Sequence, residues 1–533
     1  MTARTALIQI ARLIAIDMAK GHVGDGLMRV GERLAASPDD VIDVLTLMVK
    51  ESRKKKPNQG LIEAFGWMTG QTLEILRYGI DRNRPEAAQA VNAVRDWVRN
   101  AAASGELDAN TLLLILRQFT TAKLEMGDDL HDVMASCMER EPISVLPSKG
   151  DLDGMLEDMA HACGGNAFAL HAELVEQTSA LPDSHRGGIV AALLASTTAT
   201  AQEAAIGWLL DPGPMTRRAT ATLLLQAAEA KQVGATALRR LITMRNWLPG
   251  DERTGVDAII RTCRQKGIDC AAAAIPVVHD VLASMIDGSG AQSIFIVLKD
   301  GRKQAVAALL LKQGVGVRDA WVDSGLTKQE AEMFLYRVES QADCYDSSID
   351  YLRLALGHAL TTALGAGILP PFGLVDIVER VGLSALNPSA LPAERLVADL
   401  IGNIPGEHRT PEAVESVLKN SGDWEMDYPS LVSWFEDDAS LDSLLVGKRL
   451  SIKRQIGLVL DQFLPARRAR WAELLAWTAL TLRQDEATED DWMDFALVAQ
   501  CLLENRPLDT IPLMVTVAEK TVDAWKSRQL ARR

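Results

Sequence analysis

Residues 187–225 read GGIVAALLASTTATAQEAAIGWLLDPGPMTRRATATLLL. On both sides of the Asp211-Pro212-Gly213-Pro214 break, apolar residues recur at spacings of three and four, so each short segment carries one apolar stripe, as an amphipathic helix does. Helices this short are marginal alone and become stable when a neighbouring pair covers the stripe. The stretch therefore predicts stacked antiparallel helix pairs.

The same pattern extends over residues 186–286. A second pair is expected from Arg217 to Trp247 and closes at Pro249-Gly250, and a third pair is expected from Val256 to Leu282. Successive pairs lie roughly 30 to 36 residues apart, which is typical of helix-pair repeats. We therefore expect an α-solenoid over this part of the chain.

The turn in this stretch resembles a known repeat family. Asp211-Pro212 is followed by Arg217, Arg218 and Ala219 ahead of a leucine-rich helix, which is similar to the inter-helix turn of HEAT and armadillo repeats. In that family Asp-Pro caps the second helix, an arginine reaches along the stack, and a small residue permits close helix approach. The resemblance implies a HEAT-like α-solenoid.

One segment departs from the helical pattern. Residues 293–299, SIFIVLK, form a β-branched and aromatic run, Asp300-Gly301 is a two-residue turn signal, and a second apolar run follows from Arg302 to Leu311. These features predict a β-hairpin insertion near residues 292–311. Since residues 304–312 also suit a helix, a helix in place of the second strand stays an alternative.

The expected fold is mainly all-α, an α-solenoid of stacked antiparallel helix pairs with the small hairpin inserted. With 533 residues the chain exceeds one compact core. Thr327 followed by Glu330 predicts a helix that starts with a capping box. We predict four regions: N-terminal helices (1–145), HEAT-like repeats (146–290), the hairpin and a loop (291–325), and C-terminal helices (326–533).

Catalytic signatures are absent from the sequence. The Gly-x-Gly triplets lack the third glycine of a dinucleotide-binding turn, and P-loop, nucleophile-elbow and zinc-protease motifs do not occur. His161, Cys163, His171 and Glu173 are close enough in sequence to suggest a zinc or iron site, but helix-face residues beside a turn are the simpler interpretation. We therefore predict no metal, no cofactor and no catalytic residue.

Two acidic clusters are further candidates for acid–base chemistry. They are Asp343, Asp346 and Asp350, and Glu436, Asp437 and Asp438. Paired carboxylates serve that chemistry when burial separates their pKa values, and nothing in the sequence shows burial here. We interpret both clusters as solvated starts of helices.

Charge argues against nucleic acid as a partner unless the basic residues segregate. The chain has 56 Lys and Arg against 71 Asp and Glu, a formal net charge of −15, which repels phosphate backbones. Three basic runs exist, at residues 53–56, at residues 467–470 and in the tail from Lys526 to Arg533. HEAT-like DNA glycosylases grip duplex DNA with a basic concave face. Nucleic-acid binding is therefore an alternative, and solvated helix ends are the simpler interpretation.

Location is inferred from three patterns. Residues 7–18 carry polar residues at helical spacing, which indicates an amphipathic helix rather than a targeting signal. Residues 354–375 hold no formally charged residue, but glycines and Pro370-Pro371 interrupt them, so we expect a buried helix and turn and no membrane partner. The six cysteines are far apart, without a CxxC motif, and favour buried free thiols in a reducing cytoplasm.

These patterns favour recognition over catalysis. We predict a non-catalytic, cytoplasmic scaffold or adaptor that binds a protein through a solenoid surface, with exposed Trp and Arg anchors. An enzyme with a cleft near the hairpin is a second alternative. Because the hairpin and the glycine-flanked loop after it interrupt the stack, we place the candidate binding site there. Its residues are Asp300, Gly301, Gly314, Gly316, Arg318, Asp319 and Trp321.

Overall fold

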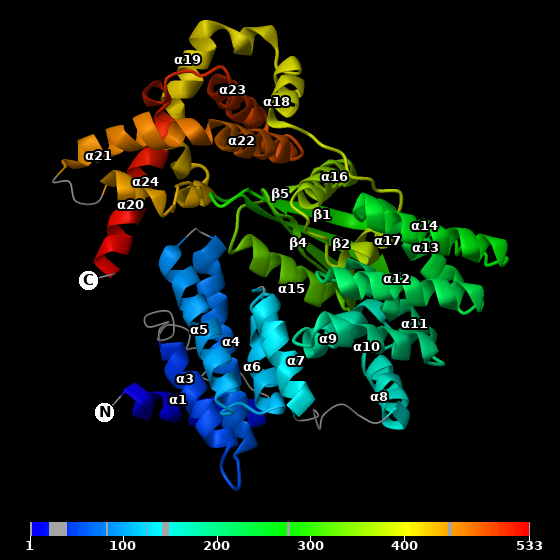
Figure 1. The fold of residues 1–533 in the computed structure, drawn as a ribbon. Coiled ribbons are helices and arrows are strands. Elements are labelled where there is room, and N and C mark those ends of the chain that lie inside the picture. Colours follow the sequence, from blue (N-terminus) through cyan, green and yellow to red (C-terminus); the bar gives the residue numbers. More distant parts are fainter. Residues whose placement is uncertain are drawn as a thin grey trace. The chain divides into compact units, whose positions relative to one another are not determined.

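The computed structural model describes residues 3–20, 40–81, 84–124, 126–140, 149–273, 278–445 and 450–531. Helices dominate it (Figure 1). The chain divides into two compact units, residues 1–209 with 213–227, and residues 210–212 with 228–533. The strands of the described residues all belong to the second unit.

The first unit is built from helices. In chain order they are α1 (Ala3–Ala19), α3 (Val41–Ser52), α4 (Gln59–Asp81), α5 (Pro85–Ala103), α6 (Ala109–Thr121), α7 (Asp128–Arg140), α8 (Lys149–Ala162), α9 (Ala167–Thr178), α10 (Asp183–Ala195), α11 (Ala199–Ala204), the 3-10 helix η2 (Ala205–Leu210) and α12 (Pro214–Glu229). Helix α4 lies centrally and contacts α1, α3, α5 and α6. Leu45, Phe65 and Leu112 belong to the core of this group, and Leu170 and Trp208 belong to a second core formed by the later helices.

The helices predicted at residues 187–225 are present, and the Asp211-Pro212 break separates η2 from α12. Here Arg186 is buried and joins neighbouring helices: its Nη1 donates to Ser179 O (3.3 Å) and its Nε to Thr216 Oγ1 (3.3 Å). Arg186 of α10 therefore connects helices on either side of the break.

The second unit contains the sheet. Its elements up to residue 380 are α13 (Ala235–Met244), η3 (Arg245–Trp247), α14 (Gly250–Gln265), β1 (Val278–Ser284), β2 (Ala291–Asp300), β3 (Lys303–Lys312), β4 (Gly316–Leu326), α15 (Lys328–Glu339), β5 (Cys344–Asp346), α16 (Ile349–Gly365) and α17 (Gly373–Arg380).

A helical domain follows the sheet in the chain. Its elements are α18 (Ala393–Gly402), η4 (Gly406–Arg409), α19 (Pro411–Asn420), η5 (Ser421–Met426), η6 (Pro429–Ser433), α20 (Ser440–Leu445), α21 (Ile452–Leu458), the π-helical turn η7 (Val459–Phe463), η8 (Leu464–Arg467), α22 (Arg468–Leu482), η9 (Glu486–Thr488), α23 (Asp491–Leu503), η10 (Leu508–Thr510) and α24 (Pro512–Ala531). Helix α22 is buried over most of its length and contacts α18 and α23.

The predicted hairpin is confirmed as part of a five-stranded antiparallel sheet with the order β4-β3-β2-β1-β5. Asp300 pairs with Lys303, so the turn residues are Gly301 and Arg302, one position later than expected. The helix alternative for residues 304–312 is wrong, because they form β3 between two paired strands. The loop expected near Arg318 is also wrong, because β4 begins at Gly316.

The helix expected at the end of the third pair is a strand. Val278–Ser284 form β1, where Val281 and Leu282 pair with β2, while Ile275 and Val277 lie outside the described residues. Valine is β-branched and favours strands, and a run this short does not separate the two structures by periodicity.

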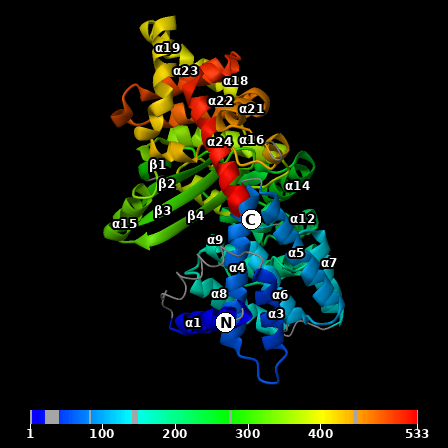
Figure 2. The same cartoon turned by 90° about the vertical axis from the view of Figure 1, so that its left-hand side faces the viewer.

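Helices cover the two faces of the sheet differently (Figures 1 and 2). On one face, the aligned residues Phe295, Ala308 and Trp321 lie beneath α15, whose Phe334 meets Phe295 and Trp321 edge to face. The opposite face packs on α16 and α22. Successive strand residues point to opposite faces, and the buried Gln292 of β2 reaches side chains of those helices there.

The uncharged stretch 354–375 forms the end of α16, the turn around Pro370-Pro371 and the start of α17. No helix in the described part of the chain combines the length and apolar character that a membrane crossing requires.

Candidate functional site

The structure splits the predicted site residues into two groups. Asp300 and Gly301 lie at one end of the ten-residue strand β3, whereas Gly314 and Gly316 lie at its other end. At about 3.3 Å per residue, the two ends are separated by about 30 Å. The turn at Gly301 therefore does not join a common site with the β3–β4 turn.

The two glycines of the β3–β4 turn have positive φ angles, which glycine adopts most readily. Gly314 has φ +76° and nothing within 4 Å of the position a Cβ would take. Gly316 has φ +98°, and a Cβ there would lie 2.6 Å from Ala359 O of α16. Gly316 therefore lets the start of β4 approach α16. Arg318 and Asp319 follow in β4 and are half-buried.

Trp321 is a predicted site residue with a large side chain that reaches the surface. It is 40% exposed and borders α15, where Met333 is 51% and Tyr336 73% exposed. We call the area formed by Trp321, Met333, Phe334 and Tyr336 the α15 surface. The aromatic residues expected near the C-terminus, by contrast, are buried. They are Trp424, Tyr428, Trp434, Trp471, Trp477 and Trp492.

Helix α15 has a capping box at its N-terminus but buries little of its surface. The capping box predicted at its start is confirmed: the Thr327 hydroxyl accepts from Glu330 N (3.2 Å), and Glu330 Oε2 accepts from Thr327 N (2.7 Å). In this twelve-residue helix Ala331 is the buried residue. Such a short helix is usually stabilised by packing of one face. The α15 surface is therefore an apolar area that the described residues leave incompletely packed.

A pocket opens where β2 and β3 meet α16 and α22, and the sequence did not reveal it. It holds about 480 Å³ of empty space, including its mouth. Apolar wall residues include Leu311, Ala355 and Leu474. The polar groups come from segments far apart in the chain and include Gln313, His358 and Glu473. We call it the sheet–α22 pocket.

The hydrogen bonds in this pocket fix the state of His358. Leu391 N donates to Nδ1 (3.2 Å), so the ring proton lies on Nε2, which donates to Glu473 Oε1 (3.1 Å). Gln313 Nε2 donates to the other carboxylate oxygen of Glu473 (2.6 Å). Burial alone would raise the pKa of Glu473, but the bonds from His358 and Gln313 hold it below its ordinary value. Glu473 is therefore ionised at neutral pH.

A buried polar cluster lies next to the pocket. The Tyr351 hydroxyl donates to Gln292 Oε1 (2.8 Å) and lies 2.9 Å from Thr481 Oγ1, which donates to Trp477 O (2.9 Å). Burial raises the pKa of Tyr351 to about 12. These bonds join β2, α16 and α22, so they hold the walls of the pocket in place.

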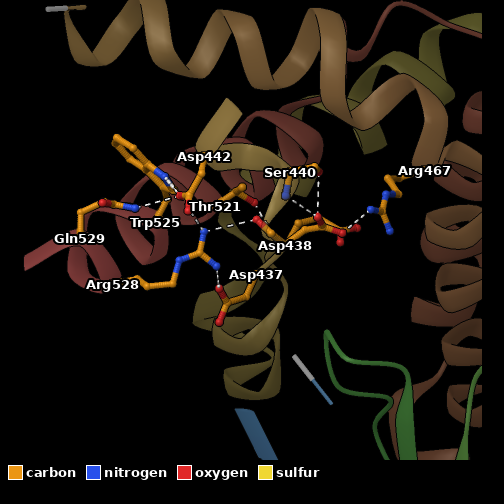
Figure 3. A network of polar contacts seen from close by, with 10 residues as sticks. Asp437, Asp438, Ser440, Asp442, Arg467, Thr521, Trp525, Arg528 and Gln529 are labelled. Atoms are coloured by element: carbon orange, nitrogen blue, oxygen red, sulfur yellow. Dashed lines mark hydrogen bonds and ion pairs between the residues drawn. The ribbon is translucent and has the colours of Figure 1, made fainter. Parts of the chain in front are cut away.

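The C-terminal basic residues meet an acidic cluster within the second unit (Figure 3). Arg467 pairs with Asp438 (2.6 Å) and Arg528 with Asp437 (2.7 Å). The Arg528 and Asp437 side chains are 5% and 7% exposed. The interpretation of residues 436–438 as a solvated helix start is therefore wrong, because the arginines compensate carboxylates that are largely buried.

The remaining predicted candidates are the side chains considered for metal binding and the cysteines. His171 is buried, its Nδ1 lies 3.2 Å from Ala204 O, and burial lowers its pKa to about 4, so it is neutral at pH 7. The described residues contain no group of three or more His, Cys, Asp and Glu side chains placed to hold a metal. All six cysteines lie in described ranges and are free thiols, and Cys270 is exposed rather than buried.

Carboxylates also gather near β5, at the start of α23. The Tyr428 hydroxyl donates to Asp491 Oδ2 (2.5 Å), and Asp485 Oδ2 accepts from Asp346 N (3.0 Å). Burial, with a contribution from Asp491, raises the pKa of Asp494 to about 6. Folding therefore favours the protonated form of Asp494 more than water does.

Replacing Asp494 by Asn is expected to stabilise the protein at pH 7.5. The folded state holds its proton up to about pH 6 and the unfolded state to about pH 4, so stability falls as pH rises between these values. The partly exposed side chain limits the gain to about 1 kcal/mol. Melting temperatures at pH 7.5 and 4.5 check this. The melting temperature of D494N should exceed that of the parent protein at pH 7.5 and equal it at pH 4.5. D509N, a change at an exposed position, should leave the melting temperature unchanged at both pH values.

Three domain families match parts of the chain. They are the Y4lR second domain (residues 182–267), a domain of unknown function called DUF7401 (residues 273–366) and the Y4lR C-terminal helical domain (residues 394–526). The uncharacterized protein y4lR of Sinorhizobium fredii is 27% identical over 464 residues, which cover 85% of this chain and 87% of that protein. No solved structure matches significantly.

These matches divide the pocket between two domains. His358 belongs to the segment that matches DUF7401, whereas Glu473 belongs to the segment that matches the Y4lR C-terminal helical domain. The α15 surface lies wholly within the DUF7401 match. The chain is therefore similar over most of its length to y4lR, a protein that is itself uncharacterized.

Proposed function

We propose that this protein is a non-catalytic protein-binding scaffold or adaptor, whose partner binds at the α15 surface. The observation that carries the proposal is that Trp321 of β4 and Met333 and Tyr336 of α15 are all exposed, on a helix whose buried residue is Ala331. Aromatic residues and methionine are enriched in the cores of protein interfaces, and contiguous apolar areas on a surface mark interaction sites.

The position of β4 supports the same proposal. β4 is an edge strand of the sheet, and its residues beyond Ala320 are mostly exposed. Up to Ala320 the strand is covered, since a Cβ on Gly373 of α17 would lie 2.0 Å from Ala320 O. An open strand edge beside an apolar surface suits a protein partner that adds backbone hydrogen bonds to side-chain contacts.

A HEAT-like stack of helix pairs is also part of the proposal, for the helices around the Asp211-Pro212 break. The break at Asp211-Pro212 and the Arg186 contacts across it support it. Such a stack would give the scaffold a second extended surface in the cytoplasm.

The alternatives have less support. Nucleic-acid binding needs free basic side chains, and in two of the three basic runs arginines are engaged with carboxylates, as Arg467 and Arg528 show. An enzyme with a cleft near the hairpin would use the sheet–α22 pocket. There, both ring nitrogens of His358 are already hydrogen-bonded, so the ring is not free to act as a base.

Replacing both Trp321 and Tyr336 by Ala should abolish capture of the protein partner. Aromatic anchors in an interface each contribute about 2 kcal/mol or more, so the double variant should bind at least about a hundredfold more weakly. The measurement is quantitative mass spectrometry of proteins retained from the native host. Met426, which is 83% exposed on η5, supplies a matched control, and M426A should retain the partner.

Circular dichroism of the double variant must first show an unchanged melting temperature. If Trp321→Ala destabilises α15, Tyr336→Ala alone can be used to test binding. Tyr336 is 73% exposed, so its replacement should not disturb the packing. Retention of the same proteins by all variants, or salt-sensitive recovery of nucleic acid in place of protein, would overturn the proposal.

A further inference from the structure

The sheet–α22 pocket presents hydrogen-bond acceptors that include the Glu473 carboxylate. Each carboxylate oxygen of Glu473 accepts from one neutral donor, His358 Nε2 or Gln313 Nε2. Among the described residues no lysine or arginine forms an ion pair with Glu473, and the nearby Arg470 pairs with Glu436 (3.0 Å). Because no lysine or arginine of the described residues pairs directly with this carboxylate, its negative charge can attract a positively charged ligand.

A second acceptor is free beside the carboxylate. Gln313 Oε1 is buried and has no hydrogen-bond partner in the described residues. Its amide orientation is fixed, because a flip would turn this oxygen towards the Glu473 carboxylate and repel it. Buried polar atoms are rarely left without a partner. Gln313 Oε1 therefore indicates that the pocket receives a hydrogen-bond donor.

The rest of the wall suits a small organic cation. Trp477 lines the pocket, and its ring lies 5.4 Å from that of His358. Aromatic rings attract ammonium groups, and the wall residues Ala355 and Leu474 would cover an aliphatic chain. A metal ion needs more ligands than one carboxylate and one amide oxygen. The pocket therefore suits an organic cation better than a metal ion.

We propose that the sheet–α22 pocket binds a small primary amine, whose ammonium group donates to Glu473 and Gln313 Oε1 while its aliphatic part lies on the apolar wall. Lys312 also lines the pocket and opposes the cation, which favours ligands with a single ammonium group. The proposal stands apart from protein binding at the α15 surface, because it depends on different residues of the second unit.

Titration of the full chain with isobutylamine hydrochloride tests the proposal. Isothermal calorimetry in phosphate buffer is suitable, since many other buffers are themselves amines. We expect a dissociation constant on the order of 1 mM, as befits a ligand of five heavy atoms. Isobutanol, which has the same shape without the charge, should bind at least about tenfold more weakly. Equal binding of amine and alcohol, or binding of neither, would overturn the proposal.

Variants of pocket residues test whether the amine binds in this pocket. E473Q should weaken isobutylamine binding at least about tenfold, while E486Q, an exposed position just beyond α22, should leave it unchanged. If E473Q fails to fold, Lys312→Gln gives the opposite test: loss of the like charge should tighten binding about threefold. Unchanged affinity in both E473Q and K312Q contradicts the assignment.

Discussion

Replacement of Arg528 by Met is expected to lower the free energy of unfolding by about 3–5 kcal/mol. The Arg528 side chain is 5% exposed, and its Nη1 donates to Asp437 Oδ1 at 2.7 Å. Methionine keeps much of the length of the side chain but removes the charge. The Asp437 carboxylate, which is 7% exposed, would then be left buried without its cation, and this desolvation accounts for the size of the effect.

Lys526 on the same helix supplies the matched control. It pairs with Asp523 at 3.5 Å, and the two side chains are 31% and 76% exposed. Surface pairs of this kind contribute at most about 1 kcal/mol, so Lys526→Met should scarcely move the urea midpoint of the second unit. Replacing Asp437 by Leu in the R528M background should restore part of the loss. Equal midpoints for R528M and K526M would show that the buried pair has no special role.

The pairing of Arg528 with Asp437 also shows where the sequence misleads. The acidic residues 436–438 and the basic tail are each conspicuous, and each alone resembles a solvated or nucleic-acid-binding surface. Arg528 and Asp437 are 91 residues apart in the chain. Local patterns do not reveal that such segments meet, because the meeting is decided by the packing of α24 against the segment before α20.

Local patterns did suffice for features with short-range causes. The capping box at Thr327 depends on neighbouring residues, and the β2–β3 hairpin depends on one turn and two adjacent runs. The strand β1 was missed because its apolar residues continue the spacing of the helices before it. β5 has three residues, too few for any period.

The candidate sites were predicted to different extents. Trp321 was expected on the basis of its position after the hairpin, whereas its neighbours Met333 and Tyr336 were not, because exposure on a helix depends on how much of its face the sheet covers. The sheet–α22 pocket was missed entirely. His358 and Glu473 are 115 residues apart, and neither belongs to a motif.

The second large effect is expected at Gly316, where Ala should cost about 2–6 kcal/mol. Its φ of +98° is strained for a residue with a side chain, which costs about 1–3 kcal/mol. In addition, the new methyl group would lie 2.6 Å from both Ala359 O and Ala363 Cβ of α16. Backbone and a rigid methyl cannot yield as a long side chain can, so α16 must move away from β4, and overpacking adds about 1–3 kcal/mol.

Gly314 separates these two causes. It shares the positive φ, at +76°, but nothing lies within 4 Å of its Cβ position. Gly314→Ala should therefore cost about 1 kcal/mol, since only the backbone term remains and the unfolded chain loses some freedom. Urea denaturation of both variants measures the difference directly. Because α16 also carries His358, G316A should weaken isobutylamine binding as well, whereas G314A should preserve it. Equal midpoints for the two variants would contradict the close approach of β4 to α16.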